Sequence, residues 1–240
     1  MKDTEKHIMV GLSGGVDSSV SALLLKEKYT HVTGAFIRTW QPDFIECTWK
    51  QDRRDAIRIA AKIGIPFKDI EAEKAYKEKV AEYMISEYKA GRTPNPDILC
   101  NREIKFGVFW QQARDLGITH IATGHYAQNF FLYNEWQLHM SKDLEKDQTY
   151  FLWKLTQDDL AHTLFPVGHL VKKDVRVIAE KADLSTAAKK DSQGVCMLGD
   201  LDMKDFLKHY IDEVPGDVVD STGTVVGKHD GVWFFTIGER

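Results

Sequence analysis

Two cysteines and a nearby carboxylate are the residues of this sequence best suited to covalent chemistry. Cys100 stands in the segment 92–106, just after Asp97 and two prolines, and Cys196 follows a lysine pair and a glycine-containing turn. A helix N-terminus or a nearby cation lowers the pKa of a thiol, and the thiolate is the nucleophilic form. We therefore expect a reactive Cys100 whose pKa is lowered by the helix N-terminus, and by Arg102 and Lys105 if they lie near it. The lysine pair Lys189 and Lys190 suggests an exposed, reactive Cys196 in electropositive surroundings. Asp97 is close enough in sequence to act as a general acid or base.

Each thiol also has an inert alternative. A buried cysteine is commonly a small apolar packing residue, and this is the default for Cys47. Asp97 in turn has the alternative role of a helix cap. The three cysteines form no Cys-x-x-Cys pair, so the sequence predicts no tightly bound metal. With two reactive thiols in one chain, one thiol is able to carry a persulfide and the other to resolve it by disulfide exchange.

The second chemical feature is the turn Ser13–Ser18, which reads Ser-Gly-Gly-Val-Asp-Ser. It follows an apolar strand and opens an amphipathic helix, so the unpaired N–H groups of the helix N-terminus form an anion site. The two glycines let the backbone approach a phosphate, and Asp17 is a candidate ligand for Mg²⁺. The turn has neither the lysine of a G-x-x-x-x-G-K-[ST] loop nor the G-x-G-x-x-G pattern. The alternative is an ordinary glycine turn in which Asp or Ser caps the helix.

The elements that position these residues alternate along the first half of the chain. We expect strands over 7–10, 31–39, 66–70 and 120–123, and helices over 18–28, 53–63, 73–88 and 104–116. This order predicts an α/β fold, a parallel sheet with helices on both faces. Ligands of such sheets bind beyond the carboxyl ends of the strands, where the turn Ser13–Ser18, Phe36–Arg38 and Thr123–His125 are expected to meet.

The sequence pattern changes near the end of the chain, from helical periodicity to short β-like runs. After an expected hairpin over 130–140 and helices over 156–162 and 173–182, the sequence shows short β-like runs over 216–219, 223–226 and 232–237. We therefore predict two domains, a catalytic domain over 1–200 and the start of a small β-rich unit over 201–240.

Composition narrows the class of protein further. The chain has 240 residues, is 43% hydrophobic and carries a formal net charge of −4, which argues against a nucleic-acid binder by overall charge alone. Its longest apolar stretches are far shorter than a membrane span requires. The polar N-terminus has no apolar signal core, which predicts a cytoplasmic protein that does not associate with membranes.

Six segments together resemble the tRNA-specific 2-thiouridylases, a family of the PP-loop ATP pyrophosphatase superfamily. The long tract that ends at Asn101 is the most specific of them, because no packing rule demands it. The matching segments are Gly11–Val20, Lys89–Asn101, Ala122–Tyr126, Lys146–Leu152, Leu164–Gly168 and Lys190–Cys196.

The resemblance implies a function for particular residues of an adenine nucleotide alpha hydrolase-like PP-loop domain. Those implied to contact ATP are Gly11, Leu12, Ser13, Gly14, Gly15, Val16, Asp17, Ser18, Ile37 and Gly124. Those implied to approach the target base are Asn95, Pro96 and Asp97. Those implied to contact tRNA are His125, Lys146, Asp147 and Gln148.

The resemblance also implies a reaction, the 2-thiolation of the wobble uridine of certain tRNAs. ATP, with Mg²⁺, would adenylate the oxygen at position 2, and Cys196 would receive persulfide sulfur from a sulfur-relay protein. The sulfur would attack directly, or as hydrosulfide released when Cys100 forms a disulfide with Cys196, while Asp97 serves as general acid/base. The family carries a further β-barrel domain of about a hundred residues, which this chain does not include.

Two other functions stay open on the sequence alone. Another PP-loop adenylating enzyme, acting on tRNA or on a small substrate, would need no cysteine pair, so its activity would survive Cys→Ser changes. A non-catalytic ATP- or tRNA-binding relative would bind ATP without releasing pyrophosphate.

Overall fold

The computed structural model describes every residue except 1–4, 46–48, 192–193, 195, 200 and 239–240. Cys47 therefore lies outside the described residues. The central sheet has five parallel strands in the order β3-β2-β1-β4-β7. These strands are β1 (His7–Gly11), β2 (His31–Arg38), β3 (Phe67–Glu71), β4 (His120–Ala122) and β7 (Thr163–Leu164).

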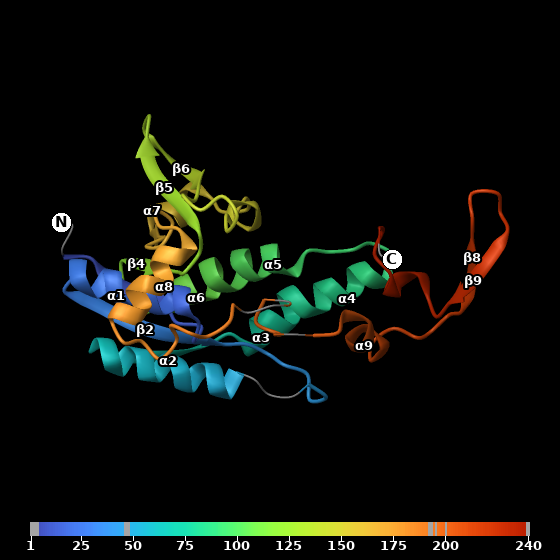
Figure 1. Ribbon diagram of the computed structural model, residues 1–240, viewed down its shortest axis with the longest axis horizontal. Helices are drawn as coiled ribbons and strands as arrows, with labels where there is room; N and C mark the ends of the chain where they lie inside the picture. The colour runs from blue at the N-terminus through green and yellow to red at the C-terminus, as the bar shows by residue number, and fades with distance from the viewer. Residues whose placement is uncertain (1–4, 46–48, 192–193, 195, 200, 239–240) are drawn as a thin grey trace.

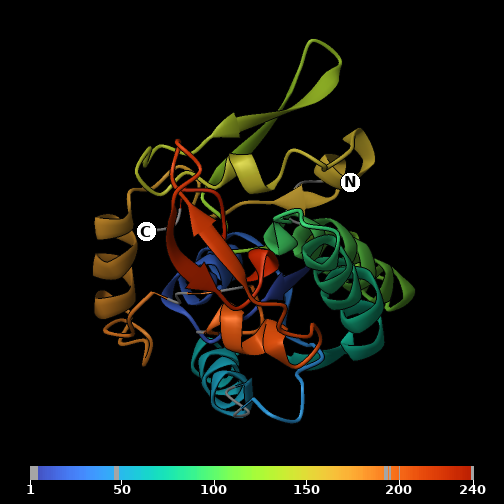
Figure 2. The same cartoon turned by 90° about the vertical axis from the view of Figure 1, so that its right-hand side faces the viewer.

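Helices cover both faces of this sheet, which confirms the predicted α/β class. On one face lie α1 (Val16–Lys28), α2 (Trp49–Ile63) and α8 (Lys172–Lys181), which share a core cluster with Ile8 and Val10 of β1. On the other face Met9 packs in a cluster with Phe109. Neighbouring residues of β1 thus enter opposite cores, as the two-residue period of a strand requires. Figure 2, seen from the end that carries β8 and β9, shows α8 and the helices of the other face on opposite sides of the strands.

Two long helical runs extend from the sheet toward the C-terminal part of the chain (Figure 1). The first consists of α3 (Glu73–Tyr76), the π-helical segment η2 (Lys77–Ala81) and α4 (Glu82–Lys89). The second consists of α5 (Pro96–Leu99), the π-helical segment η3 (Cys100–Val108) and α6 (Phe109–Asp115). The two runs share a buried cluster that includes Tyr76, Met84 and Ile104.

The second run begins eight residues earlier than the sequence predicted. Asn95 caps it, because its Oδ1 accepts hydrogen bonds from the N–H groups of Asp97 (3.1 Å) and Ile98 (3.4 Å). Pro96 occupies the first turn, where its missing N–H is no loss. The alternative role of Asp97 as the helix cap is therefore wrong, and its carboxylate is available for other contacts.

The rest of the chain confirms some expectations and corrects others. The hairpin is confirmed as β5 (Ala127–Leu132) and β6 (Glu135–Met140), joined through Tyr133 and Asn134, both with positive φ. The expected strand over 232–237 is wrong, because Val232–Phe234 forms the 3₁₀ turn η5 and Phe234 turns into a buried cluster. Other elements are the turn η4 (Thr149–Phe151), α7 (Gln157–Ala161), α9 (Met203–Lys208) and the antiparallel pair β8 (Gly216–Val219) and β9 (Val225–His229).

In the part of the chain that the structure covers, every helix is too short or too polar to cross a bilayer.

Candidate active site

The Ser-Gly-Gly turn connects β1 to α1 in a conformation that needs glycine. Gly14 has a φ of 76°, and a Cβ built on it would lie 2.6 Å from the carbonyl oxygen of Asp52. The hydroxyl of Ser18 accepts the N–H of Ser13 (3.2 Å) and donates to the carbonyl of Gly15 (3.1 Å). The turn is therefore held closed by its own side chains, with the orphan N–H groups of the first helical turn at its mouth.

The predicted ATP residues meet at the carboxyl end of the sheet. They follow β1, β2 and β4, which are parallel neighbours, so their carboxyl ends lie side by side. A Cβ on Gly124 would lie 2.7 Å from the nitrogen of Ser18, so the chain after β4 packs directly against the start of α1. Ile37 is half-buried near the end of β2. Leu12 and Val16 belong to the core, so only their backbone is available to a nucleotide. Gly11, Ser13, Gly15 and Asp17 lie at this edge as well.

The carboxylate of Asp17, the predicted ligand of Mg²⁺, is engaged by donors from the protein in this structure. The ammonium group of Lys172 lies 2.8 Å and 2.7 Å from the two carboxylate oxygens, and the hydroxyl of Tyr126 donates to one of them (2.8 Å). Three donor contacts already satisfy the carboxylate, so a cation would have to displace Lys172. No cluster of three or more Asp, Glu, His or Cys side chains suited to a metal occurs among the described residues.

The structure brings Cys100 and Cys196, 96 positions apart in sequence, into direct contact. Their sulfur atoms are 3.1 Å apart, and both thiols are free. This separation is longer than the bond of a disulfide, about 2.05 Å, so the two sulfurs interact as a hydrogen-bonded pair. Cys100 is fully buried and Cys196 is half-buried, so the expectation of an exposed Cys196 is wrong.

Two side chains from other segments hold the backbone of Cys196 in place, and a third acts on its sulfur through charge. Asp97 accepts the N–H of Cys196 (2.9 Å), and the hydroxyl of the fully buried Tyr76 donates to its carbonyl (2.7 Å). Lys105, five residues after Cys100 on η3, lies close enough for its positive charge to act on the thiol of Cys196. All three predicted catalytic residues, Cys100, Cys196 and Asp97, therefore lie in one site.

The pKa values of the two thiols shift in opposite directions. The hydrogen bond from Cys100, together with the Lys105 cation, lowers the pKa of Cys196 to about 7. The same hydrogen bond, together with burial, raises the pKa of Cys100 well above its usual value. Cys196 is thus the thiol that ionises first, around neutral pH, and Cys100 is the donor to it. The predicted lowering of the Cys100 pKa is wrong, because Cys100 holds the shared proton and is buried.

The source of positive charge agrees with the expectation for Lys105 but not for the other basic residues. The lysine pair before Cys196 was expected to make its surroundings electropositive, but Lys189 binds the carboxylates of Asp52 (2.8 Å) and Asp55 (2.9 Å) on α2. Arg102, considered for Cys100, instead pairs with Asp159 (3.1 Å). Lys105 is the cation that reaches the sulfurs.

His125 lies beneath this cation. Its ring is buried, with Nδ1 2.8 Å from the Thr123 hydroxyl and Nε2 3.3 Å from the Lys105 ammonium group. Burial, with a contribution from Lys105, keeps the pKa of His125 well below its usual value, so the ring is neutral and able to accept a hydrogen bond from Lys105.

The other residues predicted to contact tRNA differ in their exposure. Lys146 is exposed and pairs with Asp191 (3.3 Å). Asp147 accepts the N–H of Ser141 (2.8 Å), and Gln148 accepts the N–H of Tyr126 (2.9 Å), so both fix the surrounding loop. Asn95 is exposed at the start of α5, with Pro96 and Asp97 half-buried beside it.

Sequence reasoning missed three residues of the site. Tyr76 stands in none of the matching segments, and Tyr126 ends one of them without an implied role. They are recognised only by their contacts, with Cys196 and with Asp17 respectively. Lys172 stands in a lysine-rich stretch whose ordinary interpretation is a solvated helix face. No local signal separates it from its exposed neighbour Lys173.

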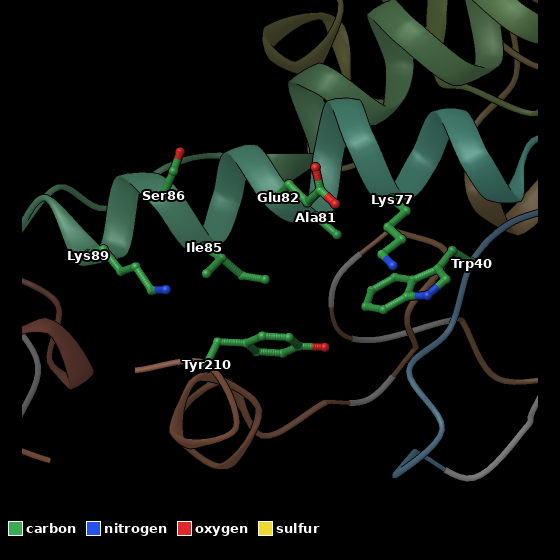
Figure 3. A pocket seen from close by; sticks show the side chains of 8 residues that line it. All are labelled: Trp40, Lys77, Ala81, Glu82, Ile85, Ser86, Lys89 and Tyr210. Carbon is green, nitrogen blue, oxygen red and sulfur yellow. The ribbon is translucent and has the colours of Figure 1, made fainter. Parts of the chain in front are cut away.

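A separate pocket of about 360 Å³ lies along η2 and α4 (Figure 3). Its aromatic walls are Trp40 and Tyr210, and Lys77 lies 6.0 Å from the centre of the Trp40 ring. None of its lining residues is a predicted site residue, so the reactive groups described above lie outside this pocket.

The fold and the turn between β1 and α1 define the class of the protein, an α/β nucleotide-binding domain of the PP-loop type. The chain belongs to the family described as tRNA methyl transferase HUP domain, whose model matches residues 6–200. A second model, described as tRNA methyl transferase PRC-barrel domain, matches residues 204–240.

Named relatives are considerably longer than this chain. It is 50% identical to tRNA-specific 2-thiouridylase MnmA 2 of Geobacillus kaustophilus and 48% identical to tRNA-specific 2-thiouridylase MnmA of Bacillus subtilis. Each match covers 98% of this chain and 64% of the relative, so the chain spans just under two thirds of their length.

Two solved structures share the fold at low sequence identity. The U34-tRNA thiolase NcsA from Methanococcus maripaludis has a TM-score of 0.52 at 19% identity, over 82% of this chain and 63% of that one. A 4-thiouridine synthetase in complex with RNA and ATP has a TM-score of 0.53 at 16% identity, over 80% of this chain and 44% of that one.

Proposed function

We propose that the chain carries the catalytic domain of a tRNA-specific 2-thiouridylase, an ATP-dependent sulfurtransferase acting on the wobble uridine. The observation that carries the proposal is the contact between Cys100 and Cys196, 3.1 Å apart, next to the Asp97 carboxylate. The segment that ends at Cys196 is also tied to the nucleotide turn, because Asp191 and Asp17 share the ammonium group of Lys172. An adenylating enzyme without sulfur chemistry gives no reason for such a thiol pair.

The first step activates the uridine. The backbone of Gly11–Ser18 binds the polyphosphate of ATP, with Ile37 and Gly124 bordering the nucleotide. The oxygen at position 2 of the uridine attacks the α-phosphorus, and pyrophosphate leaves. Asp97, which borders the thiol pair, serves as general acid/base for the uridine. The product is an adenylated oxygen, which is a good leaving group.

The second step transfers sulfur. Cys196 carries a persulfide. In one route its terminal sulfur attacks carbon 2 directly, and Cys100 then attacks the Cys196 sulfur and breaks the S–S bond, which leaves the transferred sulfur on carbon 2. In the other route Cys100 first displaces hydrosulfide from Cys196, and the hydrosulfide then attacks carbon 2. In both routes AMP leaves, the sulfane sulfur is reduced to the level of sulfide, and the two cysteines are oxidised to a disulfide. A thiol reductant must then restore the dithiol. The contact between the sulfurs and the lowered pKa of Cys196 support this exchange.

Partners and cofactors follow from the proposal. The partners are tRNA, contacted by Asn95, Pro96, His125, Lys146, Asp147 and Gln148, and a protein that donates persulfide sulfur. Mg²⁺ as a companion of ATP and a cytoplasmic location remain predictions. The division into 1–200 and 201–240 is supported by the two family models, which meet between residues 200 and 204.

Nucleoside analysis of tRNA tests the proposal. The chain is incubated with unmodified tRNA, ATP and a low-molecular-weight persulfide donor, and 2-thiouridine is measured by mass spectrometry. Cys100→Ser and Cys196→Ser are each expected to abolish the product, because each removes one partner of the exchange. Cys47→Ser is the matched control and is expected to retain activity.

Two further arms sharpen the result. Inorganic sulfide is expected to restore thiolation in Cys196→Ser, because it bypasses the persulfide carrier. Asp97→Asn keeps an oxygen for the Cys196 N–H but loses the ionisable group, and is expected to lower the rate by about 100-fold. Full thiolation by Cys100→Ser from the persulfide donor would contradict the two-cysteine scheme.

A further inference from the structure

The nucleotide turn has an unusual balance of charge for a phosphate site. Between Gly11 and Ser19 the sequence contains no basic residue, and its one ionisable side chain is the carboxylate of Asp17. Phosphate loops of the G-K-[ST] type supply a lysine from within the loop. A turn that binds polyphosphate with a carboxylate at its mouth needs a cation from elsewhere in the chain.

Lys172 is the cation that the fold delivers to this position. It is the first residue of α8, and its ammonium group contacts both oxygens of Asp17, at 2.8 Å and 2.7 Å, and one oxygen of Asp191 at 2.8 Å. The side chain is only 12% exposed. The same ammonium group lies 5.7 Å from the centre of the Tyr126 ring, whose hydroxyl binds Asp17.

We propose that Lys172 is a polyphosphate-binding residue of the nucleotide site, held over the turn by Asp17 and Asp191 and transferred to the phosphates of ATP when ATP binds. This inference rests on the proposed use of ATP. It assigns a phosphate-binding role to one residue that is distant from the turn in sequence. Lys172 would take the place of the lysine that the turn itself lacks.

The partners of Lys172 are arranged so that its transfer leaves each carboxylate with at least one hydrogen-bond donor. Asp191 keeps Arg176 (2.8 Å) and Lys146 (3.3 Å) as cationic partners. Asp17 keeps the hydroxyl of Tyr126 (2.8 Å). A half-buried carboxylate with no hydrogen-bond donor would oppose the movement, and this arrangement avoids it.

A comparison with Lys189 shows that this arrangement is specific. Lys189 also lies close to the turn, because its partner Asp52 has its carbonyl against Gly14. Among the described residues, however, Lys189 is the one group that donates a hydrogen bond to the Asp52 carboxylate, so its departure would leave that carboxylate with no donor, whereas Asp17 would keep Tyr126. Lys189 is therefore a fixed structural cation, and Lys172 is an exchangeable one.

The backbone of Lys172 is anchored while its side chain is long enough to move. Its N–H binds the carboxylate of Asp143 (2.8 Å), and Val175 and Ala179 of α8 share a core cluster with Val16 and Val20 of α1. A lysine has four methylene groups and three rotatable N–H donors, so its head group is able to exchange partners without movement of the helix.

Calorimetric titration of the purified chain with ATP and with AMP tests the inference. Lys172→Met is expected to weaken ATP binding at least tenfold and AMP binding less than twofold, because AMP lacks the phosphates that Lys172 would contact. Lys172→Arg keeps the charge and is expected to recover part of the ATP affinity. Lys173→Met, at the next and exposed position of α8, is the matched control and is expected to bind both nucleotides like the unaltered chain.

The outcomes are distinguishable. Unchanged ATP affinity in Lys172→Met would overturn this inference and leave the proposed function standing. Equal losses for ATP and AMP would overturn it too, because they would make Lys172 a structural support of the turn. Failure of the unaltered chain to bind ATP would overturn the proposed function and the inference with it.

Discussion

The nucleotide turn and the thiol pair are built in opposite ways. The turn is contiguous, and Gly14, Ser13 and Ser18 set its shape through a positive φ and local hydrogen bonds. The thiol pair joins residues 100 and 196, and its chemistry depends on side chains from other segments. The difference teaches that a backbone site is encoded in a short motif, whereas a side-chain site is encoded in the packing of the whole fold.

The comparison predicts that damage to the turn leaves the thiols unchanged. In Gly14→Ala the positive φ and the close Asp52 carbonyl impose about 3 kcal/mol of strain, which is expected to weaken ATP binding roughly 100-fold. Calorimetry with ATP measures this loss, and alkylation of Cys196 as a function of pH shows whether its pKa stays near 7. Gly91→Ala is the control, because Gly91 has a similar φ of 73° with no atom within 4 Å of its added Cβ. A shift in the Cys196 pKa in Gly14→Ala would show that the two regions are not independent.

A change beside the thiol pair is expected to leave the nucleotide turn unaffected. Lys105→Met removes the cation beside Cys196 and is expected to raise its pKa from about 7 by about 1 unit. At pH 7 the thiolate fraction and the alkylation rate therefore fall, whereas well above the new pKa the rate returns to that of the unaltered chain. Lys105→Arg keeps the charge and is expected to change the pKa little. Weakened ATP binding in Lys105→Met would contradict the separation of the two regions.

The smallest effect is expected at Tyr76. Tyr76→Phe removes the hydroxyl that donates to the carbonyl of Cys196, and is expected to lower the free energy of unfolding by about 1 kcal/mol. Urea denaturation measures this change, with exposed Tyr83→Phe as a control expected to stay within about 0.5 kcal/mol. An unchanged stability would mean that the Cys196 segment is held by Asp97 and Lys105 without help from Tyr76.

The sequence predicted the parts of the molecule that depend on local patterns. Alternation of strands and helices gave the parallel sheet, and the turn signals around Tyr133 and Asn134 gave the hairpin. The strand β7 was not predicted, because it has only two residues, too few to show a strand periodicity. The expected strand over 232–237 failed because burial of Phe234 in a distant cluster outweighed a β-like pattern.

The candidate site divides in the same way. The residues of the turn, Asp97 and the two thiols were identified from sequence, and the structure brings the last three together. The protonation of the thiols was not predictable, because it depends on which cation reaches them. Lys105 does, whereas Arg102 and Lys189 are held by carboxylates elsewhere.

The π-helical segment η3 sets a constraint on chain length. In an α-helix, residues five positions apart point about 140° away from each other. The i→i+5 hydrogen bonds of η3 bring such residues closer to one face, as at Gly107, whose added Cβ would lie 3.1 Å from the carbonyl of Arg102. Cys100 and Lys105 have this same spacing. Inserting or deleting one residue between them would rotate the ammonium group away from the sulfurs, so the number of residues matters here as much as their types.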